Sequence, residues 1–367
     1  MRRKIPLIFL ALMLLFGLAP GVDWVDRAAA EVNLSHRAAL SLEVDDNVYK
    51  ANKDLTMDYL GRLFYDFGLN WVPSTHHLLH TDYQLGGKMY ADENTEDTII
   101  NQLLLGYTNY SIPTTYLGLQ GSGKLRNVRD AEEDYFKFIG EAFVGKRFFN
   151  TFNAEIRASY IQFDFRSFDY YDYWTQAYGT QLRYDYQRSF SLGSGYRFER
   201  KVYPFNALTN VGPESGNILL MEGDERRVDN LHEINVFGRY QSFLFEKVPF
   251  LINIAYVMQI NDSNSYGDSY YNHRFLFGWS QDLMTDTNLH LLGIFQVRDS
   301  SEKVLIPHSY SIEEDDENYN QVQVRLTHGL TDYLRVQASY SRYWSHYDYE
   351  DLNFIKNLYA IGLAVSF

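Results

Sequence analysis

Apolar and polar side chains alternate along most of the chain from residue 32 onward. In the final stretch, large apolar side chains occupy every second position from Tyr359 to Phe367, and the positions between them are Ala, Gly or Ser. Successive side chains of a strand point to opposite faces, so this period of two indicates strands. The pattern therefore predicts long strands that have one apolar face and one polar or small face.

Turn-like segments divide these runs, and short connections alternate with longer ones. We place the short ones at 72–75, 111–114, 150–151, 188–189, 246–249, 284–287 and 331–332. We place the longer ones at 46–55, 92–97, 127–134, 166–172, 204–230, 261–268, 299–317 and 347–353. The sequence therefore predicts an all-β fold, a transmembrane antiparallel up-and-down β-barrel of about 16 strands (14–18), with short periplasmic turns and longer extracellular loops.

The alternation also predicts which side chains line the inside of such a barrel. A charge on the lipid face at mid-bilayer costs about 2–4 kcal/mol, so charged positions should face inward. Trp174 and Leu182 are thus predicted to face lipid, and Arg183 and Asp185 to face the lumen. The candidate pore-lining residues are Arg62, Asp66, Glu155, Arg157, Arg183, Asp185, Arg197, Glu199, Arg239, Arg274, Arg325 and Arg335. A barrel of about sixteen strands leaves room for an aqueous channel.

Composition agrees with a barrel and excludes several kinds of site. Aromatic residues make up 17% of the chain, as aromatic girdles at two membrane interfaces would require. There is no Cys, which excludes disulfides, thiolate metal sites and covalently attached haem, and we expect no cofactor. The net charge of −14 argues against nucleic acid as a partner.

The first thirty residues read as a secretory signal peptide. Arg2, Arg3 and Lys4 form a basic start, an apolar run follows at 5–19, and Ala28 to Ala30 form a small-residue cleavage site. We expect cleavage after Ala30, which divides the chain into a leader at 1–30 and one transmembrane barrel domain at 31–367.

The end of the chain resembles the C-terminal assembly signal of bacterial outer-membrane β-barrels. The residues that carry this resemblance are Tyr359, Gly362, Val365 and Phe367, in the run Tyr359-Ala360-Ile361-Gly362-Leu363-Ala364-Val365-Ser366-Phe367. The resemblance implies recognition by the barrel assembly machinery and residence in the outer membrane of a Gram-negative cell. Lipid and lipopolysaccharide would then surround the protein, and acidic outer loops would fit a lipopolysaccharide surface bridged by divalent ions.

The opening of the barrel region carries a second resemblance. An early apolar strand closes on Asp45-Asp46-Asn47-Val48-Tyr49, and the segment Ala39 to Tyr49 looks like the opening of the β-barrel porin type 2 group. Several members of that group are thought to accompany exopolysaccharide export. The resemblance implies a pore that is either polysaccharide-linked or a general diffusion channel.

The longest connection, 204–230, combines Pro and Gly with an apolar patch at 218–221 and a charged segment. One interpretation is a loop that folds into the lumen and narrows it. Its candidate constriction residues are Glu222, Asp224, Glu225, Arg226 and Arg227. The alternative is a loop packed across the barrel mouth or against a partner.

Two further clusters have ordinary explanations. The acidic run Glu313 to Glu317 could bind Ca²⁺, but it lacks the spaced ligands and the glycine of a calcium loop, so we interpret it as a solvated tip. His76, His77 and His80 lie close in sequence, but only His76 and His80 share a strand face. A metal would need further ligands, and we predict none.

The sequence therefore predicts a passive outer-membrane channel for small polar solutes, with selectivity set by lumen charges. One alternative is a barrel component of an envelope export complex with a periplasmic partner, such as one for exopolysaccharide. A second is an outer-membrane enzyme. We expect no enzyme, because the ten His residues lie without a local signature such as G-x-S-x-G.

Overall fold

The computed structural model describes residues 31–129, 134–166, 172–187, 189–212, 219–244, 248–301, 319–345 and 353–366. The predicted signal peptide, the acidic run at 313–317 and Phe367 lie outside the described residues.

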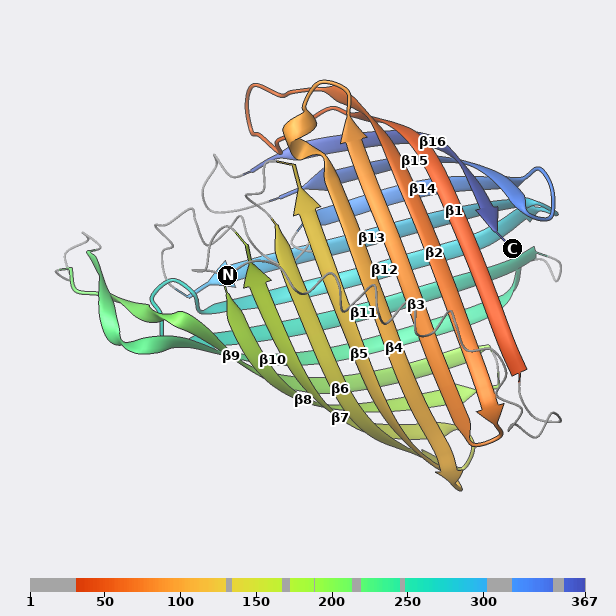
Figure 1. Ribbon diagram of the computed structural model, residues 1–367, viewed down its shortest axis with the longest axis horizontal. Helices are drawn as coiled ribbons and strands as arrows, with labels where there is room; N and C mark the ends of the chain where they lie inside the picture. Colours follow the sequence, from red (N-terminus) through yellow and green to blue (C-terminus); the bar gives the residue numbers. More distant parts are fainter. Residues whose placement is uncertain are drawn as a thin grey trace, which may run out of the picture.

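The described residues form sixteen strands that close into one barrel (Figure 1). The strands are β1 Glu31–Asp45, β2 Asp58–Ser74, β3 His77–Tyr90, β4 Thr98–Ile112, β5 Thr115–Val128, β6 Tyr135–Phe148, β7 Phe152–Phe165, β8 Tyr173–Tyr186, β9 Phe190–Asn210, β10 Leu220–Leu244, β11 Val248–Ser263, β12 Tyr270–Met284, β13 Thr287–Ser300, β14 Asn320–Gly329, β15 Leu334–Trp344 and β16 Ile355–Ser366. Each pairs antiparallel with its neighbours in sequence, and β1 pairs with β16. Closure pairs every edge of the sheet, as lipid requires, and the predicted fold class is confirmed.

The register fixes which side chains share a face, because residues directly opposite one another in antiparallel strands point to the same side. Leu42 and Ile361 oppose each other on the outside and are 70% and 61% exposed. The neighbouring Glu43 points to the other face and is 5% exposed. Following the register around the barrel assigns one inner and one outer set of side chains to every strand.

The outer face is apolar along the middle of the strands and becomes polar or aromatic toward their ends. Its charged residues lie near the end of their own strand or of a neighbouring one: Lys146, Asp164, Arg200, Asp262, Asp299 and Arg342. Four hydrogen-bonded Tyr–His pairs also lie on the outer face: His36–Tyr65, His77–Tyr107, Tyr196–His232 and Tyr256–His273. Such rings, apolar in the body and polar at the tip, suit a membrane–water interface.

The seam between β1 and β16 depends on small side chains. From Leu358 to the end of β16, the inner face consists of Leu358, Ala360, Gly362, Ala364 and Ser366. A Cβ on Gly362 would lie 2.6 Å from the carbonyl oxygen of Leu40 and 2.9 Å from the Cβ of Ser41, so only glycine fits there. Two other residues of the predicted assembly signal, Tyr359 and Val365, belong to the outer face of the same strand.

The two ends of the barrel differ in their connections. At one end, which we call the turn end, short turns join the strands, and Glu31 and Ser366 lie there too. The five predicted short turns that lie wholly within the described residues fall at this end, whereas 188 and 246–247 lie outside the described residues. Thr114, Phe149, Asn150 and Gln187 adopt positive φ in these turns. The opposite end, the loop end, carries the longer connections and a 3₁₀ turn at Asn94–Glu96. Among the described residues, no helix is long and apolar enough to cross a membrane.

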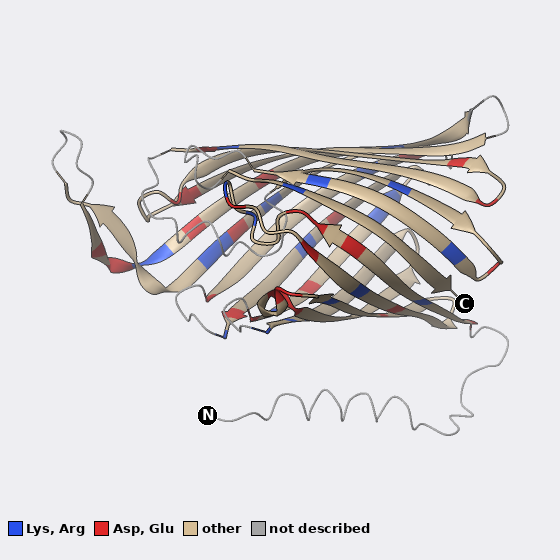
Figure 2. Ribbon diagram, turned by 90° about the horizontal axis from the view of Figure 1, so that it is seen from above, with Lys and Arg blue, Asp and Glu red and all other residues tan. Residues whose placement is uncertain are grey.

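The prediction of a loop at 204–230 that folds into the lumen is wrong for the described part of that segment. Residues 204–210 continue β9 and residues 220–230 continue β10, and the two form a hairpin that projects past the other strands in Figure 1 and Figure 2. β8 ends opposite Val202 and β11 ends opposite Asp229, so beyond these residues the hairpin strands pair with each other. Register shifts on both sides of Arg226 accommodate Pro204, which cannot donate to a ladder.

Candidate functional site

The inner face of the barrel holds the residues that were predicted to line a pore. The register places all twelve there: Arg62 and Asp66 on β2, Glu155 and Arg157 on β7, Arg183 and Asp185 on β8, Arg197 and Glu199 on β9, Arg239 on β10, Arg274 on β12, Arg325 on β14 and Arg335 on β15. Four of the five candidate constriction residues are placed elsewhere, because Glu222, Asp224, Glu225 and Arg226 lie on the projecting hairpin.

One inner carboxylate near the seam is held by a two-pronged contact. Arg62 donates from Nε to Oε1 of Glu43 at 2.8 Å and from Nη2 to Oε2 at 2.9 Å. The Ser41 hydroxyl donates to the same Oε1 at 2.7 Å. Bidentate Arg–carboxylate contacts fix both position and orientation. The pair therefore forms a rigid, neutral patch on the inner face of β1 and β2.

A second group spans β5 to β7. The Arg157 guanidinium donates to Glu141 at 3.1 Å and to Glu155 at 2.8 Å, so one cation bridges two carboxylates. The Tyr116 hydroxyl donates to Glu155 at 3.0 Å, and Arg157 lies over the ring of Phe143, 5.3 Å from its centre. This arrangement fixes both carboxylates in place.

The side chains of this inner face remain in contact with water. Arg183 pairs with Asp185 at 3.0 Å, and Arg197 pairs with Glu199 at 3.0 Å. The side chains of Arg62, Arg157, Arg183 and Arg197 are 44%, 39%, 50% and 36% exposed. Since the register points these four arginines into the barrel, that exposure is to space inside it. The interior of the barrel is thus open along these strands, and it is polar.

Three inner arginines near the turn end have no acidic partner among the described residues: Arg37, Arg239 and Arg335. A fourth, Arg325, donates to the amide oxygen of Gln323 at 3.2 Å. Asp66 lies opposite Arg37 in the register without a hydrogen bond between their side chains. The turn end therefore holds basic groups that form no ion pair with a carboxylate of the described residues.

Toward the loop end, the inner face carries an aromatic cluster made of Tyr135, Phe163, Phe165 and Tyr173, with Tyr203 packed against it. Phe163 is 1% exposed and stacks on Tyr173 with 5.3 Å between ring centres. Three cations cover these rings: Lys124 over Tyr135, Lys201 over Tyr173 and Arg227 over Tyr203. The cluster thickens the wall of β6 to β9, and the three cations pack against its rings.

The first long connection, 46–57, folds onto the inner face at the seam. Val48 is 4% exposed and packs with Leu60, Tyr90 and Leu358, all of which are inner-face residues. Asn47 is fully buried; its amide donates to the carbonyl oxygens of Ala51 at 2.8 Å and of Ile355 at 2.9 Å. The connection narrows the interior of the barrel at the loop end, because it covers the inner faces of β16, β1, β2 and β3. The sequence did not predict this role.

Arg227 lies at the base of the projecting hairpin and joins it to the next connection. It contacts Asp229 at 2.7 Å and Asp268 at 3.0 Å. Burial raises the pKa of Asp268, which belongs to the connection between β11 and β12, to about 6, while Arg227 opposes the shift and Asp229 adds to it. This cluster holds the hairpin base at the loop end.

Basic residues outnumber acidic ones on the inner face, by eighteen to thirteen. The basic residues are Arg37, Arg62, Lys88, Lys124, Arg126, Lys137, Arg147, Arg157, Arg183, Arg197, Lys201, Arg227, Arg239, Arg274, Arg298, Arg325, Arg335 and Lys356. The acidic residues are Glu31, Glu43, Asp45, Asp58, Asp66, Asp82, Glu141, Glu155, Asp185, Glu199, Asp229, Glu233 and Asp282. Figure 2 shows both kinds distributed along the strands.

The three clustered histidines do not converge. His80 faces inward and contacts Asp82 at 2.6 Å and Asn70 at 2.7 Å, whereas His77 faces outward and contacts Tyr107 at 2.8 Å. His76 belongs to the turn before β3. In the part of the chain that the structure describes, no group of three or more His, Asp or Glu could hold a metal ion.

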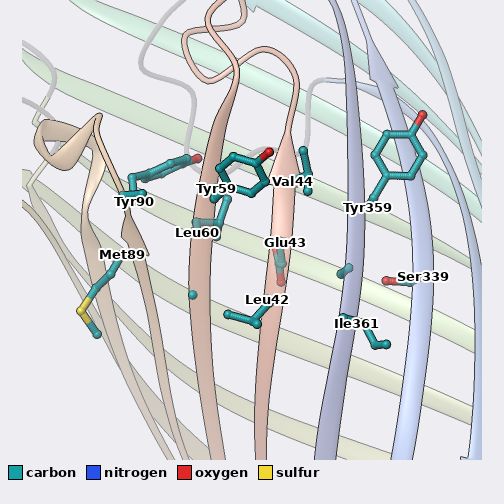
Figure 3. Close-up of a pocket in the computed structure, with 13 residues that line it drawn as sticks. Leu42, Glu43, Val44, Tyr59, Leu60, Met89, Tyr90, Ser339, Tyr359 and Ile361 are labelled. Atoms are coloured by element: carbon teal, nitrogen blue, oxygen red, sulfur yellow. The ribbon is translucent and has the colours of Figure 1, made fainter.

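A hollow of about 690 Å³ lies at the seam, among β16, β1, β2 and β3 (Figure 3). Leu42, Tyr59 and Ile361 line it from the outer face, and all three are exposed. Inner-face residues, among them Glu43 and Ser339, line it too, and its surface is mostly apolar. The hollow therefore lies between side chains of both faces at the seam.

Comparison with known proteins gives the fold. No family model matches the chain, and no curated protein matches it. Among solved structures, it is similar to CdiB from Acinetobacter baumannii, at 10% identity and a TM-score of 0.51, over 92% of this chain and 66% of that one. It is also similar to a bacterial polysaccharide outer membrane secretin (9% identity, TM-score 0.45, 90% and 97% covered) and to OccAB1 of Acinetobacter baumannii (12%, 0.46, 92% and 96%).

The chain thus has the fold of the bacterial outer-membrane β-barrels, and the closed sheet points to the bacterial outer membrane. The more specific resemblance to the porin type 2 group stays a prediction, since no family model matches.

Proposed function

We propose that this protein is an outer-membrane channel through which small polar solutes diffuse passively. One observation carries the proposal: inside a closed sixteen-strand sheet, the arginines at 62, 157, 183 and 197 are 36% to 50% exposed. Barrels of this strand number leave an aqueous passage when side chains do not fill them. Such a passage favours ions and small polar solutes, whose charges and hydrogen bonds the inner wall can meet.

The described residues place no element across the passage. Apart from the turn at Asn94–Glu96, every regular element is a strand of the wall or of the β9–β10 hairpin. The connection at 46–57 and the aromatic cluster of Phe163 narrow the loop end from two sides. We infer that these two clusters set the width of the channel there.

Conductance of the purified, refolded barrel in planar lipid bilayers tests the proposal. We expect discrete current steps that are linear in voltage. Swelling of proteoliposomes in solutions of small sugars and amino acids gives an independent measurement of solute passage. A correctly folded barrel that produces neither current nor swelling would contradict the proposal. If such a silent barrel copurified with periplasmic proteins, a role in an export complex would take its place.

A further inference from the structure

The inner face of the barrel is opposite in charge to the chain as a whole. The chain carries −14, yet basic residues exceed acidic ones on the inner face. We propose that the lumen selects for anions, so that small anionic solutes pass more readily than cations of similar size. The inference rests on the proposed function and adds its substrate class.

Most inner carboxylates lie against a cation that neutralises them. Five contacts of this kind are Glu43–Arg62, Asp45–Lys356, Glu155–Arg157, Asp185–Arg183 and Glu199–Arg197, all between 2.6 and 3.2 Å. A carboxylate in such a contact offers little net field to a passing cation, because the charge of its partner lies beside it. Both charges of each pair are offset, so the pairs contribute little to selectivity and the arginines outside them contribute more.

Part of the excess positive charge lies beside the end of β16, where the inner side chains are small. Arg37 on β1 and Arg335 and Arg325 on β15 and β14 flank the inner face of β16, where Ala364 and Ser366 are the neighbours. Arg37 and Arg325 are near enough for their positive charges to repel each other. Like charges that share an open face with small neighbours favour an anion between them, because each arginine presents several N–H donors that an anion accepts.

A second basic region lies elsewhere on the inner face, on β5 and β6. Lys124 on β5 stands directly opposite Lys137 on β6, and Arg126 is two residues further along the same inner face. The inner faces of β4 and β5 carry no acidic residue. These three residues add to the excess of basic over acidic residues on the inner face.

The acidic loop end does not reverse this preference. Its carboxylates include ones that accept backbone hydrogen bonds, such as Asp134 from Val128 at 2.5 Å and Asp172 from Phe165 at 2.7 Å. Their field in bulk solution decays over about 8 Å at physiological ionic strength. Inside the barrel, low-dielectric walls focus the field of the inner residues along the passage. The wall charges therefore decide which ions cross.

The reversal potential in a KCl gradient across a planar bilayer tests the proposal. We expect a chloride-to-potassium permeability ratio above one. The double variant Arg325→Gln, Arg335→Gln should lower that ratio by about twofold per charge, since each arginine lies at the edge of the passage. The control is Arg342→Gln, which removes one arginine charge from the outer face of β15 and should leave the ratio unchanged. Heat-modifiable migration on gels shows that each variant is folded.

The outcomes separate the two proposals. A folded barrel that conducts with a ratio at or below one overturns the anion preference and leaves the channel function standing. A ratio above one that is the same in the double variant overturns the role of the inner arginines. A folded barrel that conducts nothing overturns both. A ratio above one that falls in the double variant but not in Arg342→Gln supports the preference.

Discussion

Replacing Asn47 by Ala should release the connection at 46–57 from the inner face and widen the loop end. The Asn47 amide makes three contacts with backbone: it donates to the carbonyls of Ala51 and Ile355 and accepts from the N–H of Ala51 at 2.8 Å. The variant removes all three contacts, which a fully buried side chain makes with part-buried backbone groups.

The magnitude follows from these contacts. A hydrogen bond contributes about 0.5–1.5 kcal/mol net, so the loss of three costs about 1.5–4.5 kcal/mol. The burial of Val48 against Leu60 and Tyr90 returns about 1.5–3 kcal/mol to the docked state. The loss equals or exceeds this gain. The connection should therefore spend much of its time undocked in Asn47→Ala.

Two measurements check this. Single-channel conductance should rise, because an undocked connection no longer narrows the passage. Trypsin should cleave after Lys50, whose Nζ contacts the hydroxyl of Tyr319 at 3.0 Å when the connection is docked. Leu55→Ala is the control, since that side chain is 58% exposed in the same connection. Wild-type conductance together with unchanged resistance at Lys50 would refute the reasoning.

Three further predictions concern stability and closure. Phe163→Ala removes a 1% exposed ring from the inner aromatic cluster and should destabilise the barrel by about 3–5 kcal/mol. The loss should be seen as a lower unfolding temperature in detergent. Phe138→Ala on the outer face should have a smaller effect. Burial raises the pKa of Asp268 to about 6 from an ordinary value of 3.8, so the folded state holds this proton more tightly than the unfolded chain does. Stability should therefore fall by up to about 3 kcal/mol as pH rises from about 4 to about 6, and it should level off above that. Asp268→Asn should remove this pH dependence. An identical pH profile in that variant would contradict the prediction. Gly362→Ala brings a Cβ to 2.6 Å from the Leu40 carbonyl oxygen, so the yield of folded, heat-modifiable barrel should drop, while Ala360→Ser on the same inner face should fold normally.

Much of the fold could be predicted from sequence because the barrel repeats one simple rule. Every strand alternates with a period of two, and the turn-end connections are too short to allow any other arrangement than antiparallel neighbours. The final strand could be recognised by its small inner face, which includes Ala360 and Gly362, and the structure pairs that strand with β1. These features depend on local sequence alone.

The segment 204–230 could not be predicted from its composition. Pro204 and Gly212 indicated a loop, but the register shifts around Arg226 absorb the proline, and the hairpin continues past its neighbours. Whether a strand extends beyond the rim depends on its partner strand, and that pairing is not a local property. Because this pairing cannot be recognised locally, Glu222 and Asp224 were predicted to lie in a constriction loop and not on a strand.

The inward clusters were missed for a different reason, although a signal existed. In the run from 155 to 165, Phe163 and Phe165 are in phase with Glu155 and Arg157, so they belong to the inner set. Reading the phase of the alternation along the whole strand would have placed these rings inside. The docking of Val48 had no such signal, because it depends on a connection that returns to the seam.

Width and charge are set by different residues in this barrel, and that separation makes the two proposals independent. The width at the loop end depends on buried groups such as Asn47 and Phe163, whereas the charge depends on exposed arginines such as Arg335, many residues away along the inner face. Sites that share no contacts act additively. Asn47→Ala should therefore raise conductance and leave the permeability ratio unchanged, and Arg335→Gln should lower the ratio with little change in protease resistance at Lys50. Suppose that Asn47→Ala also changed the permeability ratio, or that Arg335→Gln also changed protease resistance at Lys50. One continuous structure would then control width and charge together, and the proposed division of roles would be wrong.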